Sequence, residues 1–117
     1  MASGTSSSLK VLMAGASWRL LGSERAAHTL LEAMSGDDEQ NRMLAGMSLV
    51  RAGKRSFALI ADRIAVGDAT PELVRLLPDI GGEQARPILD GLAENASGEL
   101  QQAAAECIDL LDRIQKL

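Results

Sequence analysis

The most reactive side chains in this 117-residue chain belong to its one histidine, His28, and its one cysteine, Cys107. A thiol nucleophile needs a base such as an imidazole within hydrogen-bond reach. The two residues lie far apart in the sequence. His28 falls on the polar side of a helical pattern, and Cys107 falls on an apolar stripe. We therefore predict a surface histidine, a buried inert thiol, no catalytic residue and no enzymatic activity.

Ligands for a metal or a cofactor are sparse. One histidine and one cysteine cannot form a structural zinc site. The acidic residues 37–39 are typical of a first helical turn, where carboxylates face the positive end of the helix dipole. The basic cluster Arg51–Arg55 lies at an expected helix start, which favours anions, but it lacks the glycine spacing of a P-loop. We predict no metal and no cofactor, with a phosphate at Arg51–Arg55 as the alternative reading.

Composition narrows the class of protein. Hydrophobic residues make up 46% of the chain and charged residues 24%, as in a folded single domain. Twelve basic and sixteen acidic residues give a net charge of −4, and the aromatic residues are one Trp and one Phe. Nucleic-acid binding needs surplus positive charge and stacking surfaces, so we expect no nucleic-acid partner.

The N-terminal segment indicates the compartment. Residues 1–8 are small and uncharged beyond the terminus, and they predict a disordered lead rather than a signal peptide. The apolar run Leu9–Ala16 contains Lys10 and is too short to cross a bilayer. A single cysteine allows no internal disulfide. The expectation is a cytoplasmic protein without a membrane partner.

The chain repeats itself with a period near 30 residues. Met13–Gly22 aligns with Leu44–Gly53 at an offset of 31, so that Ala, Gly, Ser and the closing Gly coincide. Leu30–Met34 is similar to Ile60–Ile64 and to Ile88–Leu92, at offsets of 30 and 28. Such a period predicts stacked helical hairpins.

Apolar residues at helical spacing define the expected helices, and no run alternates as a strand would. The first helices of the three pairs are predicted over Leu9–Leu21, Glu39–Ala52 and Pro71–Ile80, the last kinked or shortened by Pro78, and a closing helix over Gly98–Leu117. The predicted core stripes of the first helices are Leu12, Met13, Ala16 and Leu20; Met43, Leu44, Met47 and Val50; and Leu73, Leu76, Leu77 and Ile80. Those of the second helices and the closing helix are Ala27, Leu30, Leu31 and Met34; Phe57, Ile60, Ala61 and Ile64; Ala85, Ile88, Leu89 and Leu92; and Leu100, Ala104, Cys107, Ile108, Leu111 and Ile114.

The hairpin period, the glycine between paired helices and the Leu-Leu-Glu-x-Met and Ile-Leu-Asp-Gly-Leu segments resemble HEAT-like repeats, in the short form of phycobilin lyase-like bacterial proteins. The resemblance covers about residues 9–117. It implies an all-α, right-handed helical-hairpin solenoid of about seven helices, with three helix pairs and a closing helix in a single domain over 9–117. Such repeats serve scaffolds, adaptors, chaperones and lyase subunits.

Charged residues on the solvent side of the second helices are the candidate binding residues. An acidic row of Glu32, Asp62 and Asp90 would interleave with arginines, and the basic cluster lies beside it. The predicted partner-binding residues are Arg25, Glu32, Arg51, Lys54, Arg55, Asp62, Arg86 and Asp90. We interpret them as a charged concave surface that docks another protein. The simpler alternative is a solvated helix face.

Charge is also uneven along the chain. Residues 42–63 carry a net charge of +4 and residues 90–112 a net charge of −6, which would allow head-to-tail contact between copies. Apolar residues of the first helix, Leu9, Leu12 and Trp18, predict that the N-terminal end docks a partner or a second copy.

The function that these patterns favour is a protein–protein interaction or scaffold module. The family resemblance alone implies an alternative, a subunit of a phycobilin lyase-like cofactor-attachment complex. In that alternative, inner-face arginines and aspartates would bind the propionates and pyrrole nitrogens of a tetrapyrrole, although the inner face lacks aromatic residues.

Overall fold

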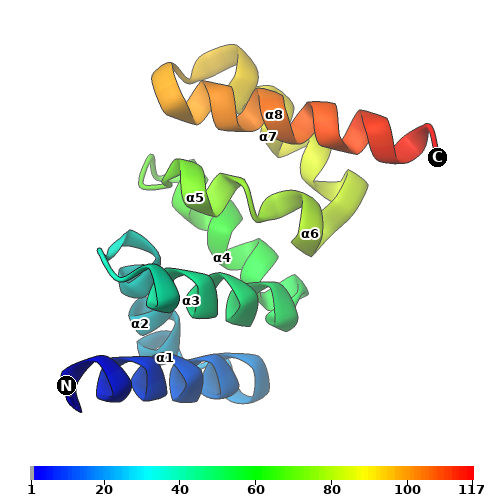
Figure 1. The fold of residues 1–117 in the computed structure, drawn as a ribbon. Helices are drawn as coiled ribbons and strands as arrows, with labels where there is room; N and C mark the ends of the chain where they lie inside the picture. Colours follow the sequence, from blue (N-terminus) through cyan, green and yellow to red (C-terminus); the bar gives the residue numbers. More distant parts are fainter. Residues whose placement is uncertain (1) are drawn as a thin grey trace. The chain divides into compact units, whose positions relative to one another are not determined.

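The protein is all-α (Figure 1). The computed structural model describes the backbone of residues 2–117 and the side chains from Ser7 onward. Over these residues the helices are α1 (Ala2–Leu21), α2 (Glu24–Ser35), α3 (Glu39–Ala52), α4 (Lys54–Ala65), α5 (Pro71–Val74), α6 (Leu77–Gly81), α7 (Arg86–Asn95) and α8 (Gly98–Gln115), with a 3₁₀ turn, η1, over Gly82–Ala85. No helix among the described residues is long and apolar enough to span a bilayer.

The chain divides into two compact units. The N-terminal unit is Met1–Arg55, and the C-terminal unit is Ser56–Leu117. The predicted single solenoid over residues 9–117 depends on how these units are arranged, so it stays a prediction. Each unit is described by itself below.

The N-terminal unit is a three-helix assembly in which α1, α2 and α3 each pack against the other two. Helix α2 begins at Ser23, whose side chain accepts a hydrogen bond from the amide of Ala26 at 3.3 Å. Helix α3 begins at Asp38, whose Oδ1 accepts from the amide of Asn41 at 3.1 Å. The prediction that residues 37–39 form a first turn is therefore confirmed.

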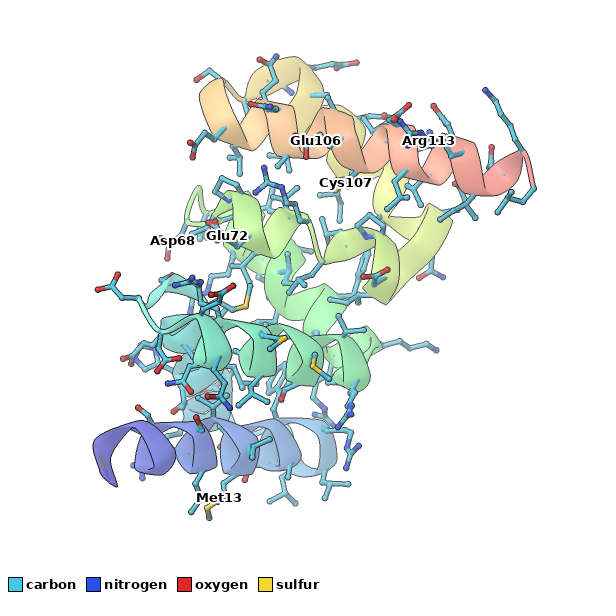
Figure 2. All side chains as sticks on the ribbon, in the orientation of Figure 1. Met13, Asp68, Glu72, Glu106, Cys107 and Arg113 are labelled. Carbon is cyan, nitrogen blue, oxygen red and sulfur yellow. The ribbon has the colours of Figure 1, made fainter. Side chains whose placement is uncertain are left out.

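Helix α1 is apolar on two opposite sides, and the predicted choice between them was wrong. Its buried side chains come from Val11, Ala14 and Trp18, with Gly15 between them. The predicted core stripe is exposed instead: Leu12, Met13, Ala16 and Leu20. With 3.6 residues per turn, these two stripes lie on opposite faces of the helix. Figure 2 shows Met13 on the side of α1 that points away from α3.

A close approach of α1 to α3 selects the buried face. A Cβ atom at Gly15 would lie 2.8 Å from the Cβ of Ser48, which is too close for two carbon atoms. Only the face of α1 that carries Gly15 can therefore meet α3, and Trp18 is buried on that same face. On α3 the buried residues include Ala45, Gly46 and Leu49. The predicted core residues Met43 and Met47 of α3 are exposed, a second error of register.

The first two turns of α1 differ from the predicted disordered lead over residues 1–8. The backbone of residues 2–8 is helical, while Met1 lies outside the described residues. The Oγ of Ser8 donates a hydrogen bond to Oδ1 of the buried Asn41 at 3.0 Å. This bond ties the early part of α1 to α3 and gives the helix a reason to extend beyond Leu9.

The C-terminal unit packs α5, α6 and α7 against α8. Thr70 caps α5 by accepting from the amide of Leu73, as the Thr-Pro-Glu motif predicts. The single helix predicted over Pro71–Ile80 is two short helices, because Pro78 has no amide to donate and occupies the start of α6. The buried hydrophobic residues of this unit are Ile60, Leu73, Val74, Leu77, Ala85, Leu89, Ala103, Ala104, Cys107 and Leu111.

The predicted core of the later helices is confirmed in part. Ile60 and Leu89 are fully buried, as are Leu30 and Leu77. Other predicted core residues are only half-buried, among them Phe57, Ala61 and Ile64 of α4 and Ile88 and Leu92 of α7. An exception is Ile114, which was predicted to be buried and is 53% exposed near the end of α8.

Paired glycine-to-alanine substitutions test the close approach. Gly91 lies inside α7, and a Cβ atom there would meet no neighbour within 4 Å. Gly91→Ala should stabilise the protein by up to about 1 kcal/mol through helix propensity. Gly15→Ala should instead destabilise it by about 1 kcal/mol or more, because the clash with Ser48 outweighs the same gain. Urea unfolding followed by circular dichroism measures both, and equal stabilisation at the two sites would contradict the packing described.

Candidate interaction surfaces

An apolar stripe is exposed along α1 in the N-terminal unit. Leu9, Leu12, Met13, Ala16 and Leu20 follow one face of the helix, and their larger side chains are 51–68% exposed. Helix α1 contains no acidic residue. A row of large apolar side chains on a helix held by two neighbours is typical of a surface that another molecule covers. We call these five residues the α1 stripe.

A shallow groove between α1 and α3 borders this stripe. It has a volume of about 100 Å³ and is lined by Leu12, Gly15, Ala16, Arg19, Ser48 and Arg51. Arg19 and Arg51 are exposed, and Arg51 is one of the predicted partner-binding residues. The groove therefore combines the apolar edge of the α1 stripe with two guanidinium groups, which suit a carboxylate.

Arg55, another predicted partner-binding residue, lies over an aromatic ring. Its guanidinium carbon is 5.9 Å from the centre of the Trp18 ring, within range of a cation–π interaction. The side chain passes Gly22, where a Cβ atom would overlap the guanidinium. Gly22 also has φ of 65°, a conformation that glycine adopts without strain. Arg55 thus covers the Trp18 ring as part of the N-terminal unit.

The remaining predicted residues of the N-terminal unit are exposed. Arg25 and Glu32 lie on α2, and Lys54 begins α4. The imidazole Nε2 of His28 contacts the carboxylate of Glu32, one helical turn later. His28 is exposed, as predicted. A solvated helix face accounts for these positions.

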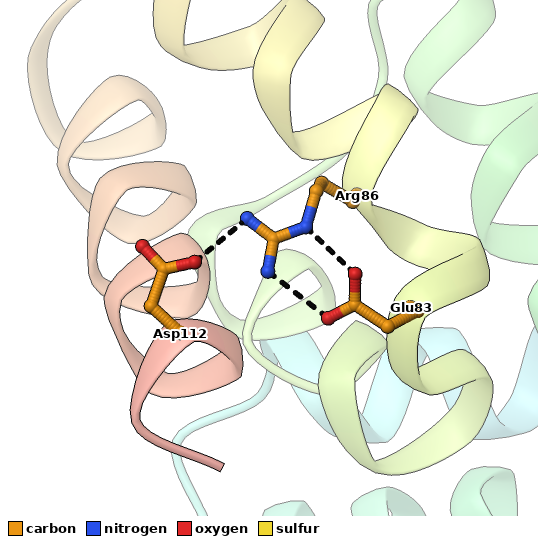
Figure 3. Close-up of polar contacts among 3 residues, drawn as sticks. All are labelled: Glu83, Arg86 and Asp112. Atoms are coloured by element: carbon orange, nitrogen blue, oxygen red, sulfur yellow. Dashed lines mark hydrogen bonds and ion pairs between the residues drawn. The ribbon is translucent and has the colours of Figure 1, made fainter. Parts of the chain in front are cut away.

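In the C-terminal unit, Arg86 is held between two carboxylates (Figure 3). Its Nε and Nη2 donate to Glu83 at 2.8 and 3.0 Å, and its Nη1 lies 2.9 Å from Oδ1 of Asp112. The hydrogen bond from Arg86 lowers the pKa of Glu83, and the same bond raises the pKa of Arg86. Arg86 stands at the start of α7 and connects it to Glu83 of η1 and to Asp112 of α8. The sequence predicted Arg86 to bind a partner and did not predict this structural role.

The acidic row predicted from the sequence is distributed over both units. Asp62 on α4 and Asp90 on α7 are exposed in the C-terminal unit, whereas Glu32 belongs to the N-terminal unit. Their alignment into one charged row stays a prediction.

A hollow of about 420 Å³ lies along α8 in the C-terminal unit. Its lining residues are Arg75, Glu106, Cys107, Asp109, Leu110 and Arg113. Oε2 of Glu106 lies 3.6 Å from Nε of Arg75, and Oδ2 of Asp109 lies 2.7 Å from Nη2 of Arg113. Leu110 is 43% exposed and supplies apolar surface to the hollow beside these ion pairs. Figure 2 marks the hollow by Glu106, Cys107 and Arg113.

Cys107 is a buried thiol. It is 4% exposed, and its Sγ donates to the carbonyl of Val74 at 3.6 Å. Burial raises the pKa of Cys107, which lowers the fraction of reactive thiolate. The prediction of a buried thiol is therefore confirmed. Among the described residues, no three His, Cys, Asp or Glu side chains lie together as metal ligands would.

The chain matches no protein-family model, no curated protein and no solved structure. A function for this chain is therefore proposed from its fold and from the geometry of its surfaces.

The sequence predicted an apolar docking end formed by Leu9, Leu12 and Trp18. Leu9 and Leu12 are exposed, whereas Trp18 is buried, so that part of the prediction was wrong. The rest of the α1 stripe was missed, because Met13, Ala16 and Leu20 were placed in the core, and so were the groove and the hollow. The repeat did contain a signal for the buried faces of α1 and α3. When Met13–Gly22 is aligned with Leu44–Gly53, the buried Ala14 coincides with Ala45 and the buried Gly15 with Gly46.

The ion pairs of Arg86 predict a pH-dependent stability. The pKa of Glu83 is lowered in the folded state. Its contribution to the stability of the fold is therefore fully present above the ordinary Glu pKa and is lost as the pH falls through the lowered pKa. Arg86→Gln should lower Tm at neutral pH, and the difference from the parent should shrink on acidification. Calorimetry at several pH values measures it. A difference that stays constant down to the lowest pH would contradict the role of Glu83. The control is Arg25→Gln, at an exposed arginine of α2.

Proposed function

We propose that the protein is a cytoplasmic protein–protein interaction module built from HEAT-like helical hairpins. Pairs of helices of similar sequence, joined by short turns, support this proposal. In such arrays the function lies in the surface that pre-ordered helices present, so that little conformational entropy is lost on binding.

The α1 stripe is the observation that carries the proposal. Leu12 and Leu20 project from a helix that α2 and α3 hold in place. Exposed leucines in a row cost solubility, and a protein partner that covers them would recover hydrophobic free energy of about 25 cal/mol per Å² buried. The arginines beside the stripe would give the contact its orientation.

The alternative of a phycobilin lyase-like subunit has less support. It needs inner-face arginines to bind the propionates of a tetrapyrrole. Arg86 is already engaged by Glu83 and Asp112, and Arg55 lies over Trp18. Both would have to break these contacts before they bound a bilin, which favours the interaction module.

Site-specific photo-crosslinking in the native host tests the proposed function. A photoreactive amino acid at Leu12 should give a discrete crosslinked protein band, because that side chain belongs to the stripe and also lines the groove beside it. The matched control is Leu21, which is 78% exposed at the end of the same helix but off the stripe. The proposal predicts a band from Leu12 and much less from Leu21. No protein crosslink from Leu12, or equal crosslinking from both positions, would contradict it.

A further inference from the structure

We propose that the α1 stripe binds the C-terminal unit of a second copy of this chain, with the hollow along α8 as the receiving surface. This inference rests on the proposed function and names the partner of the same surface. The resulting contact is head-to-tail: the N-terminal unit of one copy meets the C-terminal unit of the next.

Opposite charge on the two units supports this pairing. The N-terminal unit contains seven basic and five acidic residues, a net charge of +2. The C-terminal unit contains five basic and eleven acidic residues, a net charge of −6. Two copies therefore attract when unlike units face each other and repel when like units do.

The side chains around the two surfaces are complementary in kind. The α1 stripe is flanked by Lys10, Arg19 and Arg51, with no acidic residue on α1. The hollow presents Leu110 together with two carboxylates, Glu106 and Asp109, which pair with Arg75 and Arg113. Leucines of the stripe would cover Leu110 while the arginines approach the carboxylates.

Size also fits. Truncation of a buried leucine to alanine leaves a void on the order of 150 Å³, and the hollow has about 420 Å³. By volume, the hollow is large enough for a leucine side chain of the stripe. The carboxylates already face Arg75 and Arg113, so an incoming guanidinium would share them rather than find them unpaired. The attraction therefore comes from the surplus negative charge of the whole unit together with apolar burial.

A symmetric contact of α1 with α1 of a second copy is less favourable. It would bring the basic flanks of both stripes together with no acidic residue of α1 between them. Like charges placed opposite each other disfavour such a dimer. Because the head-to-tail contact uses two different surfaces, it adds copies into a ring or a filament.

Sedimentation velocity on the full chain, over a range of concentrations, tests the proposal. We expect reversible, concentration-dependent association at about 0.1 M NaCl that weakens at about 1 M, where screening acts over about 3 Å instead of about 10 Å. Leu12→Gln with Leu20→Gln should weaken association about tenfold or more, since the two half-exposed leucines lose apolar burial. Leu110→Gln should weaken it too, and Leu21→Gln should leave it unchanged.

Charge-reversal variants test whether the α1 stripe of one copy pairs with the hollow along α8 of another. Arg19→Glu with Arg51→Glu should suppress self-association, and so should Glu106→Arg with Asp109→Arg in a separate chain. A mixture of the two variants should associate again, because each reversed surface then meets a complementary one. Circular dichroism checks that both variants fold.

Several outcomes would overturn the proposal. These are a monomer at every concentration, association that Leu110→Gln leaves intact, or reversed variants that do not associate when mixed. If Leu12 crosslinks to a different protein while the chain stays monomeric, the proposed function stands and this inference fails. If Leu12 gives no crosslink and the chain stays monomeric, both fail.

Discussion

The close approach of α1 and α3 at Gly15 is the constraint on which the N-terminal unit depends. A side chain at position 15 would collide with that of Ser48, which lies against Gly15. Since α1 is apolar on both sides, hydrophobicity alone does not decide which side is buried. Steric fit decides it. Gly15 lies where the two helices come closest, and Trp18 is buried on the same face of α1. The leucines of the other face and Met13 are left on the outside.

The charged side chains divide into those that hold the fold and those that face solvent. Arg86 connects η1, α7 and α8 through two carboxylates, and Arg55 covers the ring of Trp18. Arg19 and Arg51 line a groove beside exposed apolar surface. Arg86 and Arg55 are thus engaged within the fold, while the guanidinium groups of Arg19 and Arg51 stay exposed to solvent.

Much of the fold was predictable from the sequence, for physical reasons that differ between helices. Helix α3 has the predicted bounds because Asp38 caps one end and Gly53, with φ of 57°, ends the other. Ile60 and Leu89 are buried as predicted, since α4 and α7 have one apolar side each. In α1 the two apolar sides compete, so residue size misled the prediction. At Pro78 a kinked or shortened helix was predicted, but complete separation of α5 from α6 depends on tertiary packing. The candidate surfaces could not be predicted in the same way. To find them one must know which face of α1 is buried and which residues of different helices come together, and the periodicity of the sequence determines neither.

Fluorescence quenching of Trp18 tests the central claim most directly, because it is the one tryptophan in the chain and lies on the buried face of α1 at 7% exposure. The measurement uses dilute protein at high salt, so that association does not shield the ring. The account predicts that iodide quenches Trp18 several-fold less than it quenches a free tryptophan derivative. Quenching equal to that of the free derivative would mean that α1 faces the other way, with Leu12, Met13 and Leu20 inside, and would contradict the account.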